Sequence, residues 1–262
     1  MSRNSLFILF VAYSVMVAAQ SSLSGETPDE LLQSASEAAN RRENEKAIKL
    51  ATQAIEMKPD LAFAYYLRGR SHFCAGNVHA SVVDLDKYVE LNPKVAPRQW
   101  ERGISYYYDK QYKKGADQFI LYQTYDDADV ENSVWRFLCQ APIDGVEKAR
   151  KDMLPIENDR RIPMMDVYNM FRGRVTPDEV LEVAKENSVN NEALNRSLFY
   201  AHLYIGLYHE AHKNPDLARK HITLAADKHK IGHYMWDVAH IHAKLLAMKN
   251  GKASDKGDST SP

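Results

Sequence analysis

The sequence predicts an all-α fold, a solenoid of antiparallel helix pairs with a divergent middle and a C-terminal capping helix. Two observations support this prediction. Pro59 and Pro93 lie 34 residues apart, and so do Gly69 and Gly103. A ladder of small residues repeats at the same interval, at Ala47, Ser81, Gly115 and Ala149. A fixed period of this length is typical of stacked helical repeats.

Each of these positions has a physical reason in a helix hairpin. Packed helices approach to about 8–10 Å, so each needs a small residue where the backbones cross most closely. Gly69 and Gly103 would serve the first helix of a pair, and the ladder would serve the second. Pro59 and Pro93 would end each second helix, because proline lacks the amide proton and clashes with the preceding turn.

These residues resemble tetratricopeptide repeats. Three units are expected within residues 28–127, at about residues 28–59, 62–93 and 96–127. The second and third carry the pattern most fully, whereas the first has Ala35 where the glycine is usual. The resemblance implies a concave groove that receives segments of partner proteins.

After residue 127 the period is lost and then returns. Residues 130–190 are expected to form divergent helix pairs, with one helix ending near Gly173 and the next starting at Thr176. Residues 192–249 are expected to form a further tetratricopeptide unit and a capping helix that covers the last apolar face. The polar residues 250–262 are expected to be a disordered tail.

The N-terminus predicts a secretory signal peptide over residues 1–19. Arg3 precedes an apolar run over residues 6–17, which is shorter than the roughly 20 apolar residues of a membrane-spanning helix. We expect cleavage near Ala19, a linker over residues 20–27, and an exported protein that is periplasmic or secreted. An uncleaved anchor is the alternative. Because no cysteine lies near the cut, no lipid anchor is expected.

The order of these parts resembles the NlpI-type bacterial envelope lipoproteins. The likeness is clearest in "VWRFLCQ", "VYNMFRGRVTPDEVL" and "LFYAHLYIGLYHEA". It implies a dimeric periplasmic scaffold that holds peptidoglycan endopeptidases and presents them to a tail-specific processing protease. The lipidated cysteine of that family is absent from this sequence, so the resemblance does not extend to its membrane attachment.

Composition narrows the classes of partner. The formal net charge of −1 supplies no global basic field, so no nucleic-acid partner is expected. The two cysteines, Cys74 and Cys139, are too few for a disulfide framework. They belong to repeats two apart, and layers about 10 Å thick would separate them beyond the roughly 7 Å that a disulfide allows. Two free thiols are therefore expected.

The repeat register also predicts a binding groove. The tetratricopeptide resemblance places these residues on its wall: Phe63, Tyr66, Arg70, Phe73, Trp100, Ile104, Tyr107 and Tyr108. Aromatic side chains give a large contact area at low entropic cost, and Arg70 could pair with a carboxylate of the ligand. Two alternatives remain. The N-terminal segment or the divergent middle of the chain could fill the groove, or the groove could join two copies in a homodimer.

Sequence patterns that would indicate catalysis or metal binding are weaker than those that indicate a binding groove. The "HEAH" of His209 and His212 is one residue short of H-E-x-x-H, and spacing sets no third ligand. The carboxylates of "DDADVE" are expected in a solvated turn, and Lys148, Arg150, Lys151, Arg160 and Arg161 in an exposed face or an anion-binding patch. The sequence therefore predicts no enzyme, catalytic residue, metal or cofactor. It predicts a protein-binding scaffold or adaptor, or alternatively a self-associating scaffold without a peptide ligand.

Overall fold

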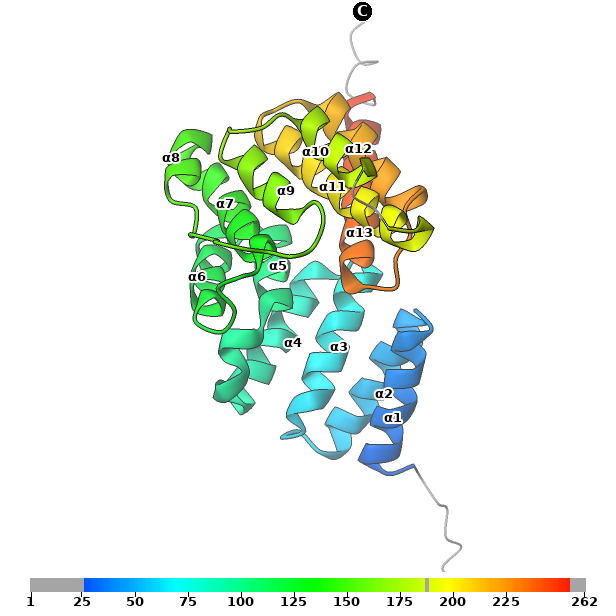
Figure 1. The fold of residues 1–262 in the computed structure, drawn as a ribbon. Coiled ribbons are helices and arrows are strands. Elements are labelled where there is room, and N and C mark those ends of the chain that lie inside the picture. Colours follow the sequence, from blue (N-terminus) through cyan, green and yellow to red (C-terminus); the bar gives the residue numbers. More distant parts are fainter. Residues whose placement is uncertain (1–25, 187–188, 255–262) are drawn as a thin grey trace, which may run out of the picture.

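The computed structural model describes residues 26–186 and 189–254, and all regular secondary structure in these ranges is helical (Figure 1). Successive helices pack against one another as antiparallel pairs, which confirms the all-α class and the solenoid arrangement. The predicted signal peptide, most of the predicted linker and residues 255–262 lie outside the described residues. None of the described helices combines the length and apolar character needed to cross a bilayer.

The helices follow in chain order. They are α1 (Pro28–Asn40), α2 (Asn44–Met57), α3 (Ala62–Ala75), α4 (Val78–Leu91), the 3-10 helix η1 (Pro93–Arg98), α5 (Trp100–Tyr108), α6 (Tyr112–Gln123), α7 (Val130–Asp144), α8 (Val146–Lys151), α9 (Met164–Phe171), α10 (Pro177–Glu186), α11 (Asn191–Ala211), α12 (Pro215–Asp227) and α13 (Tyr234–Ser254). The pairs α1–α2, α3–α4 and α5–α6 occupy the segment in which three repeats were expected.

Helix ends follow local sequence signals. Thr27 caps α1, because its Oγ1 accepts from the Glu30 amide at 3.3 Å and the Glu30 carboxylate accepts from the Thr27 amide at 2.8 Å. The expected start at Thr176 is confirmed, since Thr176 and Glu179 form the same reciprocal pair before α10. Gly76 ends α3 in the left-handed region, at φ 90°, which glycine adopts without strain.

Small residues sit at the closest helix crossings. A Cβ added to Gly103 would lie 2.7 Å from Cζ of Phe119. One added to Gly206 would lie 2.7 Å from Cγ1 of Ile222 and 3.0 Å from its backbone nitrogen. Every member of the predicted ladder is buried. The 34-residue spacing therefore does mark where paired helices touch.

Two details add to the predicted boundaries. Within the third unit, expected at about residues 96–127, the first α-helix begins at Trp100, because η1 precedes it. Pro97 explains this difference: proline lacks an amide proton and disfavours the α conformation in the residue before it. The expected tail begins too early, since α13 continues to Ser254. Gly251 costs that helix only about 1 kcal/mol.

The last helix, α13, turns back onto the N-terminal half of the solenoid. It packs along α12 and also contacts α3, and Figure 1 shows its orange end beside the cyan α3. Asp237 of α13 forms an ion pair with Arg42, which follows α1, at 2.9 Å. One core cluster joins Phe73 of α3 to Tyr234 and Val238 of α13. The capping helix thus lies within the concave side of its own solenoid.

Candidate functional site

The predicted groove is largely occupied by the protein itself. Phe73 and Ile104 are both 0% exposed, so their assignment to a ligand-binding wall is wrong for this conformation. Phe73 packs against Tyr234, with ring centroids 5.5 Å apart, and Trp100 meets the same ring at 5.4 Å. Among the described residues, the groove is filled by the C-terminal helix α13 and, further along, by α7 of the divergent middle.

Further along the groove, α13 and α7 cover two predicted tyrosines. Tyr107 packs edge-on against Trp135 of α7 with centroids 5.4 Å apart. The hydroxyl of Tyr108 lies 2.8 Å from Nδ1 of His242, whose Nε2 lies 2.9 Å from a carboxylate oxygen of Glu210. Burial raises the pKa of both tyrosines well above the usual value. These contacts hold α13 against α5 and α11.

The opposite end of the predicted groove is closed by polar contacts. Tyr66 donates to Oε1 of Glu101 at 2.9 Å, and Arg70 lies 3.7 Å from the same oxygen. The Arg70 guanidinium also stacks over the Tyr234 ring at 4.7 Å. The Arg70 guanidinium therefore already contacts a carboxylate and an aromatic ring of its own chain, and it is not free to pair with a ligand carboxylate. Of the eight predicted residues, Phe63 alone is largely exposed, at 48%.

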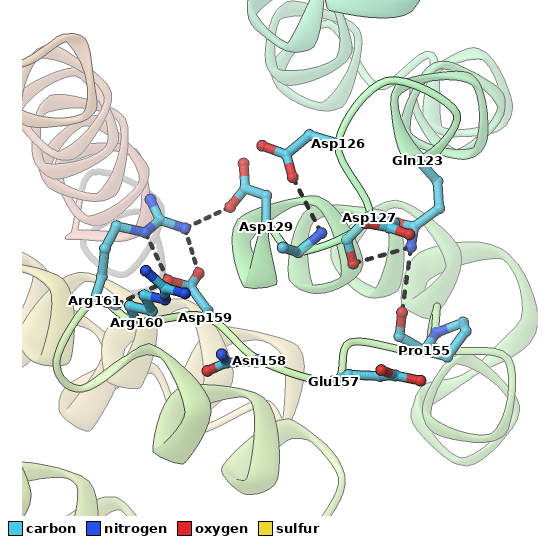
Figure 2. A pocket seen from close by; sticks show the side chains of 11 residues that line it. Gln123, Asp126, Asp127, Asp129, Pro155, Glu157, Asn158, Asp159, Arg160 and Arg161 are labelled. Atoms are coloured by element: carbon cyan, nitrogen blue, oxygen red, sulfur yellow. Dashed lines mark hydrogen bonds and ion pairs between the residues drawn. The ribbon is translucent and has the colours of Figure 1, made fainter.

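Beside the filled groove, an acidic cleft of about 720 Å³ opens between the α6–α7 loop and the segment joining α8 to α9. Its charged lining consists of Asp126, Asp127, Asp129, Glu157, Asp159, Arg160 and Arg161. Figure 2 shows the Arg161 guanidinium between Asp129 and Asp159, with Asp126 on the far side of the opening. None of these seven residues was assigned to the groove from sequence.

One guanidinium serves three carboxylates in this cleft. Arg161 lies 2.5 Å from Asp129, 2.6 Å from Glu131 and 2.5 Å from Asp159. Tyr204 of α11 donates a hydrogen bond to the Glu131 carboxylate. Since one positive charge cannot neutralise three negative ones, this group of four ionised side chains keeps a net charge of −2.

Backbone interactions fix the carboxylates in place. Asp129 caps α7 by accepting from the Glu131 amide at 3.0 Å, and Asp159 accepts from the Val130 amide at 3.1 Å. Burial, and next the charge of Glu131, raises the pKa of Asp129 to about 6. The expectation of a fully solvated turn is therefore wrong for Asp129 and Glu131, because the segment carrying Arg161 folds over them.

A smaller inner cavity of about 190 Å³ adjoins the cleft. The two volumes share Asp129 and Arg161 in their linings. The cavity is also lined by Trp100, Phe119, Tyr122, Glu131, Asn132, Trp135, His233 and Met235. Its walls thus come from α5, α6, α7 and the start of α13. Trp100 is the predicted groove residue that the structure places at this site.

Two buried polar atoms of this lining have no hydrogen-bond partner in the protein. Asn132 is 2% exposed, and its Oδ1 accepts nothing, although its Nδ2 donates to Gln123. Trp135 is 1% exposed, and its Nε1–H finds no acceptor. Buried polar groups are nearly always hydrogen-bonded, so an unpaired acceptor and an unpaired donor on two residues of one cavity wall are exceptions.

The two histidines of "HEAH", His209 and His212, pack against different residues. His209 lies near His221, with ring centroids 5.9 Å apart, whereas His212 packs on Tyr208 at 4.0 Å. His221 and His202 bring their Nδ1 atoms to 3.0 Å. Burial, and next the neighbouring imidazoles, lowers the pKa of each to about 4. Across residues 26–186 and 189–254, no group of three or more His, Cys, Asp or Glu is arranged to hold a metal ion.

Both thiols are free, as predicted. Burial raises the pKa of the Cys74 thiol to about 12 and that of Cys139 above its usual value.

The basic residues predicted to form one cluster make separate contacts instead. Arg161 joins the carboxylates, Arg150 binds Glu147 and the Phe171 carbonyl, and Lys148 pairs with Asp152.

No protein-family model matches this chain. Sequence reasoning missed the cleft because its two sides, residues 123–129 and 155–161, lie on two different loops. Both loops carry several charges in a short stretch, "YDDADVE" and "ENDRR". The carboxylates of the first loop and the arginines of the second, on either side of the α7–α8 pair, are the signal that could have indicated their pairing.

Proposed function

We propose that this chain is an exported scaffold or adaptor, built from repeats of the tetratricopeptide type, that binds partner proteins. The observation that carries the proposal is the acidic cleft and its aromatic inner cavity. Together they offer one charged surface and one recess beside a groove that α13 already fills. In this proposal the partner lies in the cleft, and the packed helices hold the binding side chains in fixed positions.

The rigidity of the site supports a binding role. Asp129 and Asp159 are held by backbone amides, and Arg161 is held by three carboxylates, so their geometry exists before any partner arrives. A preorganised site loses less conformational entropy on binding than a mobile one. The further role of linking cell-envelope hydrolases to a processing protease rests on the sequence resemblance and belongs to the same proposal.

A self-associating scaffold is the second candidate. The exposure of Phe63 favours it, since this aromatic side chain lies in solvent beside the closed end of the groove. In that case the filled groove would be structural, and a second copy of the chain would pack over the α3 end of the solenoid.

Site-specific photo-crosslinking in the native host tests these functions. A photoreactive amino acid at Glu157, which is exposed in the cleft, should form a covalent adduct with a partner of a different sequence. The matched control places the same amino acid at Asp117, an exposed residue of α6 outside the cleft. A third position, Phe63, reports on self-association. Adducts with the same chain from Phe63, and none from Glu157, would refute the adaptor function and support the scaffold.

A further inference from the structure

We infer that the inner cavity receives a cationic side chain, a lysine or arginine of the partner segment that lies in the acidic cleft. The inference rests on the proposed function and names the chemistry of the segment that the site would recognise. Three properties of the lining carry it: its charge, its aromatic walls and its buried acceptor.

The charge of the site favours a cation. The cleft and the cavity together are lined by six carboxylates and two guanidinium groups, which leaves a formal charge of −4 when His233 is neutral. His233 is neutral at pH 7, because burial, and next Arg70, lowers its pKa. Asp129 and Glu131 reach the cavity itself, where one arginine is shared by three carboxylates. A bound ammonium or guanidinium would offset this excess negative charge.

The walls of the cavity suit the same ligand. Trp100, Tyr122 and Trp135 bring aromatic rings to its lining. A cation over the face of such a ring gains about 0.5–2 kcal/mol, most where water is excluded. Trp100 is held in place by His233, which stacks on it with ring centroids 6.2 Å apart and 12° between the planes. The apolar stem of a lysine or arginine would pack against these rings.

The cavity wall also contains a buried acceptor. An ammonium group carries three N–H donors and no acceptor, and a guanidinium carries five. Asn132 lines a cavity of about 190 Å³, which has room for such a head group, and its covered Oδ1 is an acceptor without a partner behind the cavity wall. An apolar side chain would leave the excess negative charge of the site without compensation, and an anionic one would add to it.

The three tryptophans of the chain provide the test, because their indole N–H resonances can be followed by NMR. The Nε1–H of Trp135 has no protein partner, and Trp100 shares the cavity with it. Trp236 donates to the Ala226 carbonyl at 2.9 Å and is an internal control. The probes are blocked pentapeptides with four alanines around a central lysine, arginine, norleucine or glutamate. The lysine or arginine peptide should shift the Trp100 and Trp135 resonances saturably and leave Trp236 unchanged.

Two variants sharpen the test. Asp129→Asn keeps the cap on α7, because asparagine and aspartate cap equally well, and should weaken binding of the cationic peptide roughly tenfold. Asp117→Asn removes a carboxylate outside the site and should leave the affinity unchanged. Asp129→Asn is also expected to fold, so a loss of binding would not reflect unfolding.

The possible results separate this inference from the proposed function. Equal shifts of the Trp100 and Trp135 resonances with the norleucine or glutamate peptide would overturn cation selectivity. The absence of a shift with any of the four peptides would overturn the inference as well. If heterologous adducts still form at Glu157, the adaptor function stands without the cation-binding cavity. If adducts are absent while the lysine peptide binds, the cavity is a cation site and the adaptor function fails.

Discussion

Replacing Asp129 by asparagine should stabilise the protein at neutral pH, although the change removes a partner of Arg161. Asp129 shares that guanidinium with Glu131 and Asp159. Burial and the charge of Glu131 outweigh the attraction of Arg161, so the pKa of Asp129 rises from 3.8 to about 6. Asparagine removes the buried charge and keeps the helix cap, which isolates the electrostatic effect.

The sign of the effect follows from proton binding. A carboxyl whose pKa is higher in the folded than in the unfolded state makes the folded protein less stable as pH rises through the folded value. One pKa unit corresponds to 1.36 kcal/mol, so ionisation of Asp129 costs about 3 kcal/mol at pH 7.5. At pH 5 the folded carboxyl is largely protonated, and the cost falls to about half of that value.

Urea denaturation followed by circular dichroism measures both values. The free energy of unfolding of Asp129→Asn should exceed that of the wild type by about 3 kcal/mol at pH 7.5, and by about half as much at pH 5. Asp117→Asn, on an exposed α6 position paired with Lys113, should change stability by less than about 0.5 kcal/mol at either pH. A variant no more stable than the wild type, or a difference independent of pH, would refute this account of the cluster.

Three further predictions address α13, helix packing and acid stability. Tyr234→Ala should lower the free energy of unfolding by about 3–5 kcal/mol, whereas Tyr234→Phe should be neutral or stabilising, because the buried hydroxyl has no partner. Gly206→Ala should cost about 1–3 kcal/mol in a urea titration, since the new methyl group meets Ile222. Protonation of His202 and His221, whose pKa values are lowered to about 4, should destabilise the fold as pH falls below 6.5; His221→Gln should therefore move the acid midpoint to lower pH in circular dichroism.

Each of these has its own contrary result. A loss above about 1 kcal/mol in Tyr234→Phe would show that the hydroxyl has a partner after all. Unchanged stability in Gly206→Ala would mean that α11 and α12 can separate at little cost. An acid midpoint unaffected by His221→Gln would remove the paired imidazoles from the causes of acid unfolding.

Sequence pattern predicted the helix pairs well and the site poorly. The spacing of Gly69, Gly103 and the ladder of small residues follows from contacts within a pair and between neighbouring pairs, which are close in sequence. The predicted groove residues on α3 and α5 did come together, with Trp100 and Phe73 contacting one tyrosine ring. Their predicted exposure was wrong because α13, which begins at Tyr234 and so lies far later in the chain, covers them.

The period of small residues and prolines was enough to specify an all-helical solenoid, because steric fit between adjacent helices is local and repeats with the chain. Two features depend on contacts between distant segments. The seating of α13 in the concave side requires Asp237 to reach Arg42, and the acidic cleft requires Arg161 to fold over Asp129 and Glu131. Neither contact has a fixed spacing in the sequence, since each depends on where the whole solenoid brings its ends and loops.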